Sequence, residues 1–124
     1  MKRLAVLLLL VVLLLGACSK REEKAQIVAQ TGGNIDHGRQ LVQQYGCTSC
    51  HDIPNVSGPR GMVGPPLTGF ASRQIIAGKF PNTTENLTKY LQNPQLADPA
   101  NAMPNLGLTP DQTRDIAAFL YTLK

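Results

Sequence analysis

The chain has 124 residues, with three cysteines, no tryptophan and few aromatic side chains. This length allows one small domain once processing segments are set aside. The 12 Lys and Arg exceed the 8 Asp and Glu, but they form no basic run and have no stacking aromatics among them, so we expect no nucleic-acid binding.

The N-terminal segment has the organisation of an export signal. Lys2 and Arg3 precede an unbroken apolar run over residues 4–15. Twelve helical residues span about 18 Å, well short of the ~30 Å hydrocarbon core of a bilayer. We therefore expect residues 1–17 to be a secretory signal, with an uncleaved short membrane anchor as the alternative. Cleavage would lower the net charge from +4 to +2, because two of the twelve basic residues leave with the signal.

The apolar run ends in the sequence LGAC over residues 15–18. This sequence resembles the lipobox of bacterial lipoproteins. The resemblance implies cleavage before Cys18 and a lipid on its thiol, and a free cysteine past an ordinary cleavage site is the alternative. Two or three acyl chains hold a protein firmly on a membrane, whereas a single chain does not.

Residues 18–33 are charged at first, then small and polar, and end in two glycines. We expect them to carry the lipid and to act as a flexible tether, with some helix over residues 22–30. A flexible coil of this length reaches roughly 20 Å on average. The folded domain is then expected over residues 34–124.

The domain opens with a helix predicted over residues 35–45, where apolar residues recur at helical spacing until a glycine stops it. A second helix is predicted over residues 84–92. Asn82 or Thr83 can cap its N-terminus, with Glu85 in the capping-box position, and a proline beyond its end terminates it.

The last helix has the clearest signals. Thr109 is placed to cap it, Pro110 takes the first helical position, and Gln112 takes the capping-box position. An apolar stripe then continues to the C-terminus, and no alternating strand pattern of useful length is present, so we expect an all-α domain. Three short helices among glycine- and proline-rich loops give a sparse core, and a large apolar group is therefore expected inside it.

The sequence GCTSCHD over residues 46–52 brings Cys47, Cys50 and His51 together. A structural zinc site needs a fourth ligand, a thioredoxin-like pair needs a strand–helix framework, and a disulfide would explain neither the histidine nor the sparse core. C-x-x-C-H is the attachment sequence of c-type haem, whose two vinyl groups can be reached by two thiols one helical turn apart. A motif this short also arises by chance, so the rest of the domain has to support it.

Further segments resemble the class I cytochrome c family over some ninety residues from residue 36. They are GRQLVQQYGC (38–47), GPPLTGF (64–70), LTKYLQNP (87–94) and IAAFL (116–120). In that family the aromatic of the last segment packs near the first helix's glycine, here Gly38. The stretch over residues 81–109 is most similar to the haem domain appended to subunit II of caa3-type cytochrome oxidases. The chain departs from that pattern because it shows neither the membrane hairpin nor the copper domain.

The resemblance implies a class I cytochrome c fold, with three main helices and long loops wrapped round one covalently bound haem c. By that match, Cys47 and Cys50 hold the haem, and His51 and Met103 are the axial ligands of its iron. The carbonyl of Pro65 is expected to accept the Nδ1 proton of His51, which orients the ring.

The resemblance also implies partners for the haem propionates. Arg73 falls where the family often keeps an arginine near a propionate. The tryptophan that some members use is absent, so Arg73, Tyr90 and Asn101 are expected to share that role. The Tyr90 hydroxyl is also expected within reach of the Met103 sulfur, with ordinary core packing as the alternative.

Met62 and His37 are the other candidate ligands in the expected domain. Met62 follows His51 by eleven residues on the histidine side, so we expect it to pack in its loop and not to reach the iron. Met103 sits on stiff backbone beside a proline, which suits a ligand. His37 lies on the polar opening turn of the first helix and is expected to be solvated.

These features predict an electron carrier. An iron with histidine and methionine on its two axial positions has no open site for oxygen or peroxide. We expect a lipid-anchored monohaem carrier on the outer side of a bacterial cytoplasmic membrane, or facing the periplasm. Its donor would be a complex such as a quinol-oxidising one, and its acceptor a terminal oxidase. A fixed subunit of a larger membrane enzyme, or less favourably a haem-based gas sensor or detoxifying enzyme, is the alternative.

Overall fold

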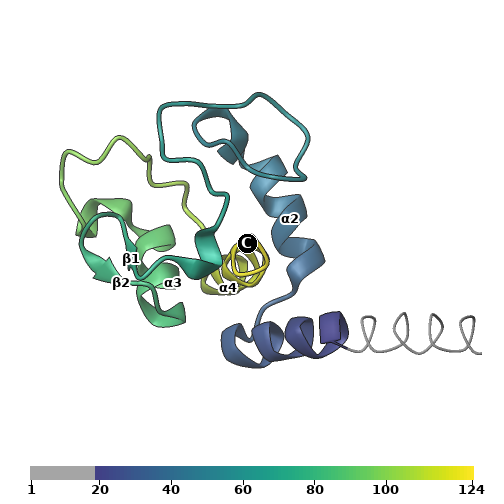
Figure 1. Cartoon of the computed structure of the whole chain (residues 1–124). Helices are drawn as coiled ribbons and strands as arrows, with labels where there is room; N and C mark the ends of the chain where they lie inside the picture. The colour runs from purple at the N-terminus through teal and green to yellow at the C-terminus, as the bar shows by residue number, and fades with distance from the viewer. Residues whose placement is uncertain (1–18) are drawn as a thin grey trace, which may run out of the picture.

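The computed structural model describes residues 19–124, so the expected signal peptide and Cys18 lie outside the described residues. The chain forms a small all-α domain with one minimal strand pair, which confirms the predicted fold class (Figure 1). After a helix over residues 19–31, the elements are α2 (Ile35–Gln44), η1 (Cys47–Ser49), η2 (Phe70–Ser72), β1 (Ile75–Ile76), β2 (Phe80–Pro81), α3 (Thr84–Gln92), η3 (Pro94–Leu96) and α4 (Pro110–Leu120).

The helix α2 carries the first half of the domain's core. The Asn34 side chain caps it by accepting a hydrogen bond from the His37 N–H, and Leu41 and Val42 are buried on its inner face. The chain leaves the helix through Gly46, which adopts a left-handed conformation with φ of 68°. Since glycine reaches that conformation without steric cost, Gly46 allows the sharp turn that starts the Cys47–Cys50 segment.

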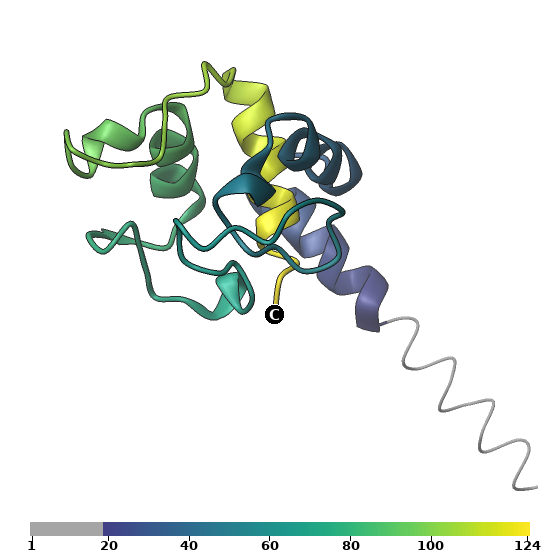
Figure 2. The same ribbon diagram turned by 90° about the horizontal axis from the view of Figure 1, so that it is seen from above.

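The helix α4 crosses α2 closely, as Figure 2 shows. The Thr109–Gln112 capping box forms as predicted, and Phe119 is completely buried. An ideal Cβ on Gly38 would lie 2.5 Å from the Asp115 carbonyl carbon and 3.0 Å from the Phe119 Cβ, so a glycine is needed where the two helices meet. The expected packing of an aromatic side chain near Gly38 is therefore confirmed.

The helix α3 lies on the other side of α4 and buries Leu87 and Leu91 (Figure 1). Thr83 caps it by accepting a hydrogen bond from the Asn86 N–H. Glu85 was predicted to complete a capping box, but it forms an ion pair with Lys89 one turn further along the helix instead. Capping by Thr83 places Asn86, and not Glu85, at the third helical position.

The segment expected to be a flexible tether is helical over residues 19–31 and packs beside α4 (Figures 1 and 2). Ile27 is only 8% exposed and belongs to the hydrophobic core, and the Thr31 hydroxyl donates to the Ile27 carbonyl oxygen at 2.8 Å. Glu23 pairs with Lys124 at the other end of the chain. The helix expected over part of this segment thus extends over residues 19–31, where burial of Ile27 offsets the entropy lost on ordering the chain. The role of residues 18–33 as a tether stays a prediction.

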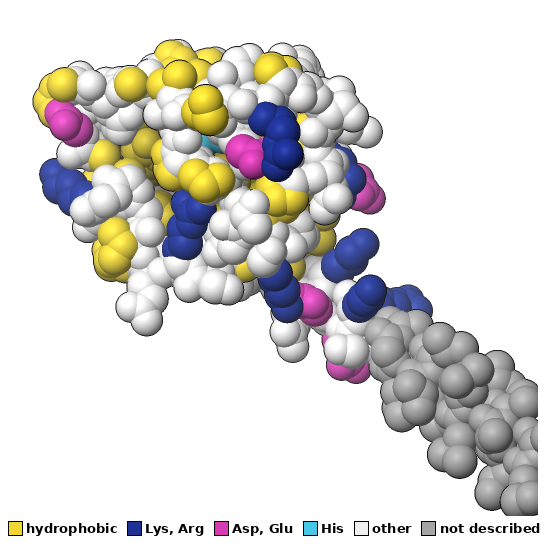
Figure 3. Space-filling view, turned by 45° about the horizontal axis from the view of Figure 1, so that its top comes forward, with side chains coloured by type: hydrophobic (Ala, Val, Ile, Leu, Met, Phe, Trp, Pro, Cys, Tyr) yellow, Lys and Arg dark blue, Asp and Glu magenta, His cyan; other side chains and the backbone are white. Residues whose placement is uncertain are grey.

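Within residues 19–124, no helix is both long and apolar enough to cross a bilayer. On the face shown in Figure 3, charged side chains are scattered over the domain among hydrophobic and neutral ones, and several of both signs gather at the helix over residues 19–31. Two large hydrophobic side chains are strongly exposed in the loop that precedes Gly64, namely Met62 at 94% and Val63 at 73%. This loop forms one edge of the hollow described next.

Candidate functional site

The hydrophobic core of the domain surrounds two adjoining hollows of about 450 and 210 Å³. Protein interiors are normally close-packed, with few voids larger than a water molecule. The walls of the larger hollow are apolar side chains from α2, α3, α4 and the loops between them, which are Val42, Ile53, Leu67, Phe70, Ile75, Ile76, Leu87, Leu91, Ile116 and Leu120. A space of this size lined by core residues is shaped for a large apolar group.

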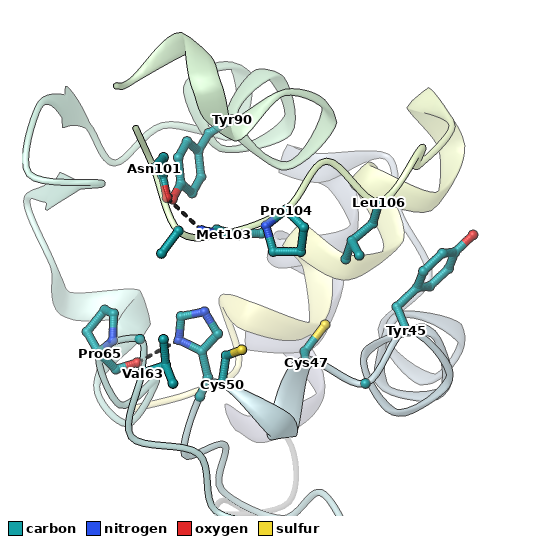
Figure 4. Close-up of a pocket in the computed structure, with 14 residues that line it drawn as sticks. Tyr45, Cys47, Cys50, Val63, Pro65, Tyr90, Asn101, Met103, Pro104 and Leu106 are labelled. Carbon is teal, nitrogen blue, oxygen red and sulfur yellow. Dashed lines mark hydrogen bonds between the residues drawn. The ribbon is translucent and has the colours of Figure 1, made fainter. Parts of the chain in front are cut away.

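All eight residues predicted from the sequence to contact the cofactor line these hollows. Six of them face both, namely Cys47, His51, Pro65, Tyr90, Asn101 and Met103. Cys50 lines the smaller hollow and Arg73 the larger one. Residues up to 56 positions apart in the sequence therefore meet at one place, as Figure 4 shows for the smaller hollow.

The two cysteines project from a single turn. Cys47 begins η1, and its carbonyl oxygen accepts hydrogen bonds from the N–H groups of Cys50 at 3.2 Å and His51 at 2.9 Å. The two thiols are half-buried and are not joined in a disulfide. Burial raises the pKa of the Cys47 thiol above its ordinary value, with a smaller contribution from Cys50 in the same direction. The thiol is thus held in its neutral form against an apolar wall.

The imidazole of His51 is fixed in orientation. Its Nδ1 lies 2.8 Å from the Pro65 carbonyl oxygen, as predicted, and the Gly64 N–H donates to the Cys50 carbonyl oxygen at 2.8 Å. A Cβ on Gly64 would lie 2.6 Å from Nδ1, so the ring packs directly on this glycine. Because a carbonyl oxygen only accepts, Nδ1 carries the proton and Nε2 keeps the free lone pair that a metal ligand needs.

Met103 lies on the opposite wall of the smaller hollow from Cys47, Cys50 and Pro65 (Figure 4). Its N–H donates to the Asn101 Oδ1 at 2.9 Å. The Asn101 Nδ2 in turn donates to the Tyr90 hydroxyl at 3.1 Å. The Tyr90 hydroxyl is thus held by Asn101, and its expected approach to the Met103 sulfur stays a prediction.

Arg73 and Asn101 both have protein partners for their side chains. The Arg73 guanidinium donates to the carbonyl oxygens of Pro66 and Thr68 and lies over the Phe70 ring, 5.6 Å from its centroid. The Asn101 side chain forms hydrogen bonds with the Met103 N–H and the Tyr90 hydroxyl. The role of these residues with haem propionates stays a prediction, as it does for Tyr90.

The other two candidate ligands lie away from the hollows. Met62 lines neither of them and stands in solvent, so the expected packing within its loop was wrong. His37 is half exposed, but its Nδ1 lies 2.7 Å from the Asp115 Oδ2, so it is paired with α4 and not simply solvated. Within residues 19–124, no three His, Cys, Asp or Glu side chains gather into a group that could hold a metal ion.

Sequence reasoning missed Gln95, whose Nε2 donates to the Met103 carbonyl oxygen at 2.9 Å. No motif marks this contact, because it joins two points of an irregular loop. The sequence also did not indicate that the Asn101 Oδ1 accepts a hydrogen bond from the Met103 N–H, although asparagine commonly binds the N–H two residues further along in Asx turns. The segment GPPLTGF over residues 64–70 resembles the family in sequence, but the steric reason for Gly64 appears only in three dimensions.

The residues present fit a covalently attached haem. Two thiols on one turn, an imidazole with a free Nε2 and a thioether on the facing wall surround an apolar space. This combination defines a c-type haem protein of the electron-carrier class.

Comparison with known proteins agrees with that class. Residues 35–124 match the family model for cytochrome c, and the chain belongs to the cytochrome c family. It is 31% identical over 101 residues to cytochrome c oxidase subunit 2 of Alkalihalophilus pseudofirmus, a match that covers 81% of this chain and 29% of that protein. The chain thus spans less than a third of the length of this relative. Family membership implies one covalent haem c and an electron carrier, not an enzyme.

Proposed function

We propose that this protein is a lipid-anchored monohaem cytochrome c that carries single electrons between membrane respiratory complexes. The observation that carries the proposal is that His51 and Met103 line the same apolar hollow, with Met103 on the wall opposite Cys50, which precedes His51 in the chain. Cys47 and Cys50 would hold the haem as thioethers, and the haem would supply the one-electron couple. A thioether opposite an imidazole favours ferrous iron relative to two imidazoles and leaves no open coordination site.

The protein side chains would keep the iron's surroundings nearly constant between oxidation states. The Pro65 carbonyl fixes the His51 ring, and Asn101 fixes the Met103 main chain. With a haem in place, the apolar wall would exclude water from the hollow, which would limit solvent reorganisation when charge changes. Such a site suits rapid electron transfer better than bond-making chemistry.

The edge of the site indicates the chemistry of its partners. None of the fourteen residues that line the smaller hollow is Asp, Glu, Lys or Arg, and Val63, one of the fourteen, is strongly exposed. Residues 34–124 contain seven basic and six acidic side chains, so the domain is close to neutral. Docking to a donor or acceptor would therefore depend on apolar contact, and its rate would change little with salt.

The electron donor would be a complex such as a quinol-oxidising one, and the acceptor a terminal oxidase. The similarity to an oxidase subunit supports the acceptor, since that relative is named cytochrome c oxidase subunit 2. The same similarity supports a second candidate, a fixed subunit of a larger membrane oxidoreductase. Lipid attachment at Cys18 would place the protein on the outer face of a bacterial cytoplasmic membrane, or facing the periplasm.

Reoxidation by native membranes tests this function. The purified, reduced protein is mixed with membranes of its source, and the haem absorbance is followed with and without cyanide. Rapid, cyanide-sensitive oxidation that varies little between low and high salt supports a carrier that serves a terminal oxidase. Failure of the membranes to oxidise the protein would refute it. Retention in a purified oxidase after a high-salt wash would favour the fixed subunit.

A further inference from the structure

The segment between η3 and α4 carries Met103 but has no regular structure of its own. Residues 97–109 contain no helix or strand. Only one backbone hydrogen bond joins two residues within this segment, from the Asn101 N–H to the Asp98 carbonyl oxygen at 2.9 Å. A loop of this kind does not by itself hold a side chain in one position. Other contacts have to fix Met103.

Two amide side chains supply those contacts. The Met103 N–H donates to the Asn101 Oδ1 at 2.9 Å, and the Met103 carbonyl oxygen accepts from the Gln95 Nε2 at 2.9 Å. Both main-chain polar groups of Met103 are therefore paired, one on each side. The hydrogen bonds are partly buried, so water competes with them less than at the surface.

Each amide is itself held by a structured part of the protein. Asn101 donates to the Tyr90 hydroxyl on α3 at 3.1 Å and to the Pro94 carbonyl oxygen at 3.3 Å. Gln95 lies in η3, directly after α3, and also approaches the Asn101 carbonyl oxygen at 3.5 Å. The main chain of Met103 is thus tied to the end of α3 through two side chains.

We propose that Gln95 is a positioning residue for Met103, and that its hydrogen bond limits how often the Met103 sulfur leaves the iron. This inference rests on the proposed role of Met103 as an axial ligand. Loss of one hydrogen bond of this kind changes a conformational equilibrium by roughly 3- to 10-fold. The population of the ligand-free state should rise by that factor when the Gln95 donor is removed.

Replacement by glutamate separates the hydrogen bond from packing. Gln95→Glu keeps the size of the side chain but presents only acceptors when ionised, so it cannot donate to the Met103 carbonyl oxygen. Gln95→Ala removes the side chain together with its hydrogen bond, so both variants lose the donor while only Gln95→Glu keeps the packing.

Gln92→Glu is the matched control. Gln92 is the last residue of α3, three positions before Gln95, and in the described part of the chain no hydrogen bond joins its side chain to Met103. The same change of an amide to a carboxylate there should leave the Met103 ligand undisturbed.

The experiment measures the rate of CO binding to the reduced holoprotein and the far-red sulfur-to-iron absorption band of the oxidised protein. We expect Gln95→Ala and Gln95→Glu to bind CO roughly 3- to 10-fold faster than wild type at pH 7, with a weaker band. Gln92→Glu should match wild type in both measurements. If both Gln95 variants behave like wild type, or if Gln92→Glu has an equal effect, the proposed role of Gln95 is overturned while ligation by Met103 stands. A wild-type protein without the band overturns ligation by Met103, and the proposal with it.

Discussion

The crossing of α2 and α4 makes a quantitative prediction for Gly38→Ala. A Cβ at this position would lie 2.5 Å from the Asp115 carbonyl carbon, whereas carbon atoms in contact are normally about 3.5–4.0 Å apart. The two helices would therefore have to separate by about 1 Å or more, and a gap of that size removes roughly half of the dispersion energy between the atoms that line it. Phe119, which is fully buried at the crossing, would lose contacts.

Two effects of the substitution oppose each other. Alanine is a better helix former than glycine by about 1 kcal/mol, which alone would stabilise the protein. Overpacking of a tight interface costs about 1–3 kcal/mol and occasionally more, and here backbone atoms are in the way, so relief is difficult. We expect the cost to lie at the upper end of that range, because the clash is with backbone atoms, so that about 3 kcal/mol of overpacking outweighs about 1 kcal/mol of helix propensity. The net loss in the free energy of unfolding is then about 2 kcal/mol.

Thermal unfolding of the holoprotein, followed by far-ultraviolet circular dichroism, measures this loss. A loss of about 2 kcal/mol lowers the Tm of a domain of this size by about 10 °C. Gln40→Ala is the control, because it changes an exposed residue of the same helix and should shift stability by less than about 0.5 kcal/mol. If Gly38→Ala is as stable as wild type or more so, the close approach of the two helices does not exist in the protein.

Three further predictions concern the anchor, the cofactor and the loop beside His51. Cys18→Ser should release the haem-stained protein into the soluble fraction, and persistent membrane binding would show that the apolar run itself is the anchor. The Cys47→Ser/Cys50→Ser double variant should show little cooperative unfolding by circular dichroism, since the core would remain hollow; a sharp transition would contradict this. The hydrogen bonds from Arg60 lower the pKa of Asp52 below its ordinary value of 3.8, so Arg60→Gln should raise that pKa in an NMR titration. The folded-state pKa of Asp52 is depressed, so the pair with Arg60 should stabilise the wild-type protein above pH 3.8, and this stabilisation should vanish as the pH falls through the folded-state pKa. Wild type and Arg60→Gln should therefore differ in urea midpoint above pH 3.8 and agree in stronger acid. A difference that persists in stronger acid would contradict the assignment.

The sequence was informative where local signals and side-chain chemistry act over short distances. The bounds of α3 and the start of α4 follow from capping threonines and from prolines, which act within one turn. The Cys47, Cys50 and His51 cluster was evident because its members are neighbours in the chain. The contact of Pro65 with His51 came from a family resemblance and not from the spacing itself.

Features that depend on contacts between residues far apart in the chain could not be predicted from local sequence signals. Ile27 looks like one apolar residue in a polar segment, and its burial depends on how α4 and the C-terminus are placed. The pairing of His37 with Asp115 joins residues 78 positions apart. Gln95 was overlooked because nothing in a loop sequence indicates which carbonyl oxygen its amide will reach.

The most direct test of electron transfer through an iron held by His51 and Met103 is the absorption spectrum of the wild-type protein, combined with exposure of its reduced form to CO. The oxidised protein should show the far-red band of sulfur ligation, and the reduced protein should bind CO poorly at neutral pH. Met103→Ala should lose the band and bind CO readily, whereas Met62→Ala should behave like wild type, because that side chain is 94% exposed and lines neither hollow. Ready binding of CO by the wild-type protein would contradict a filled coordination sphere and favour a gas sensor or an enzyme over a carrier.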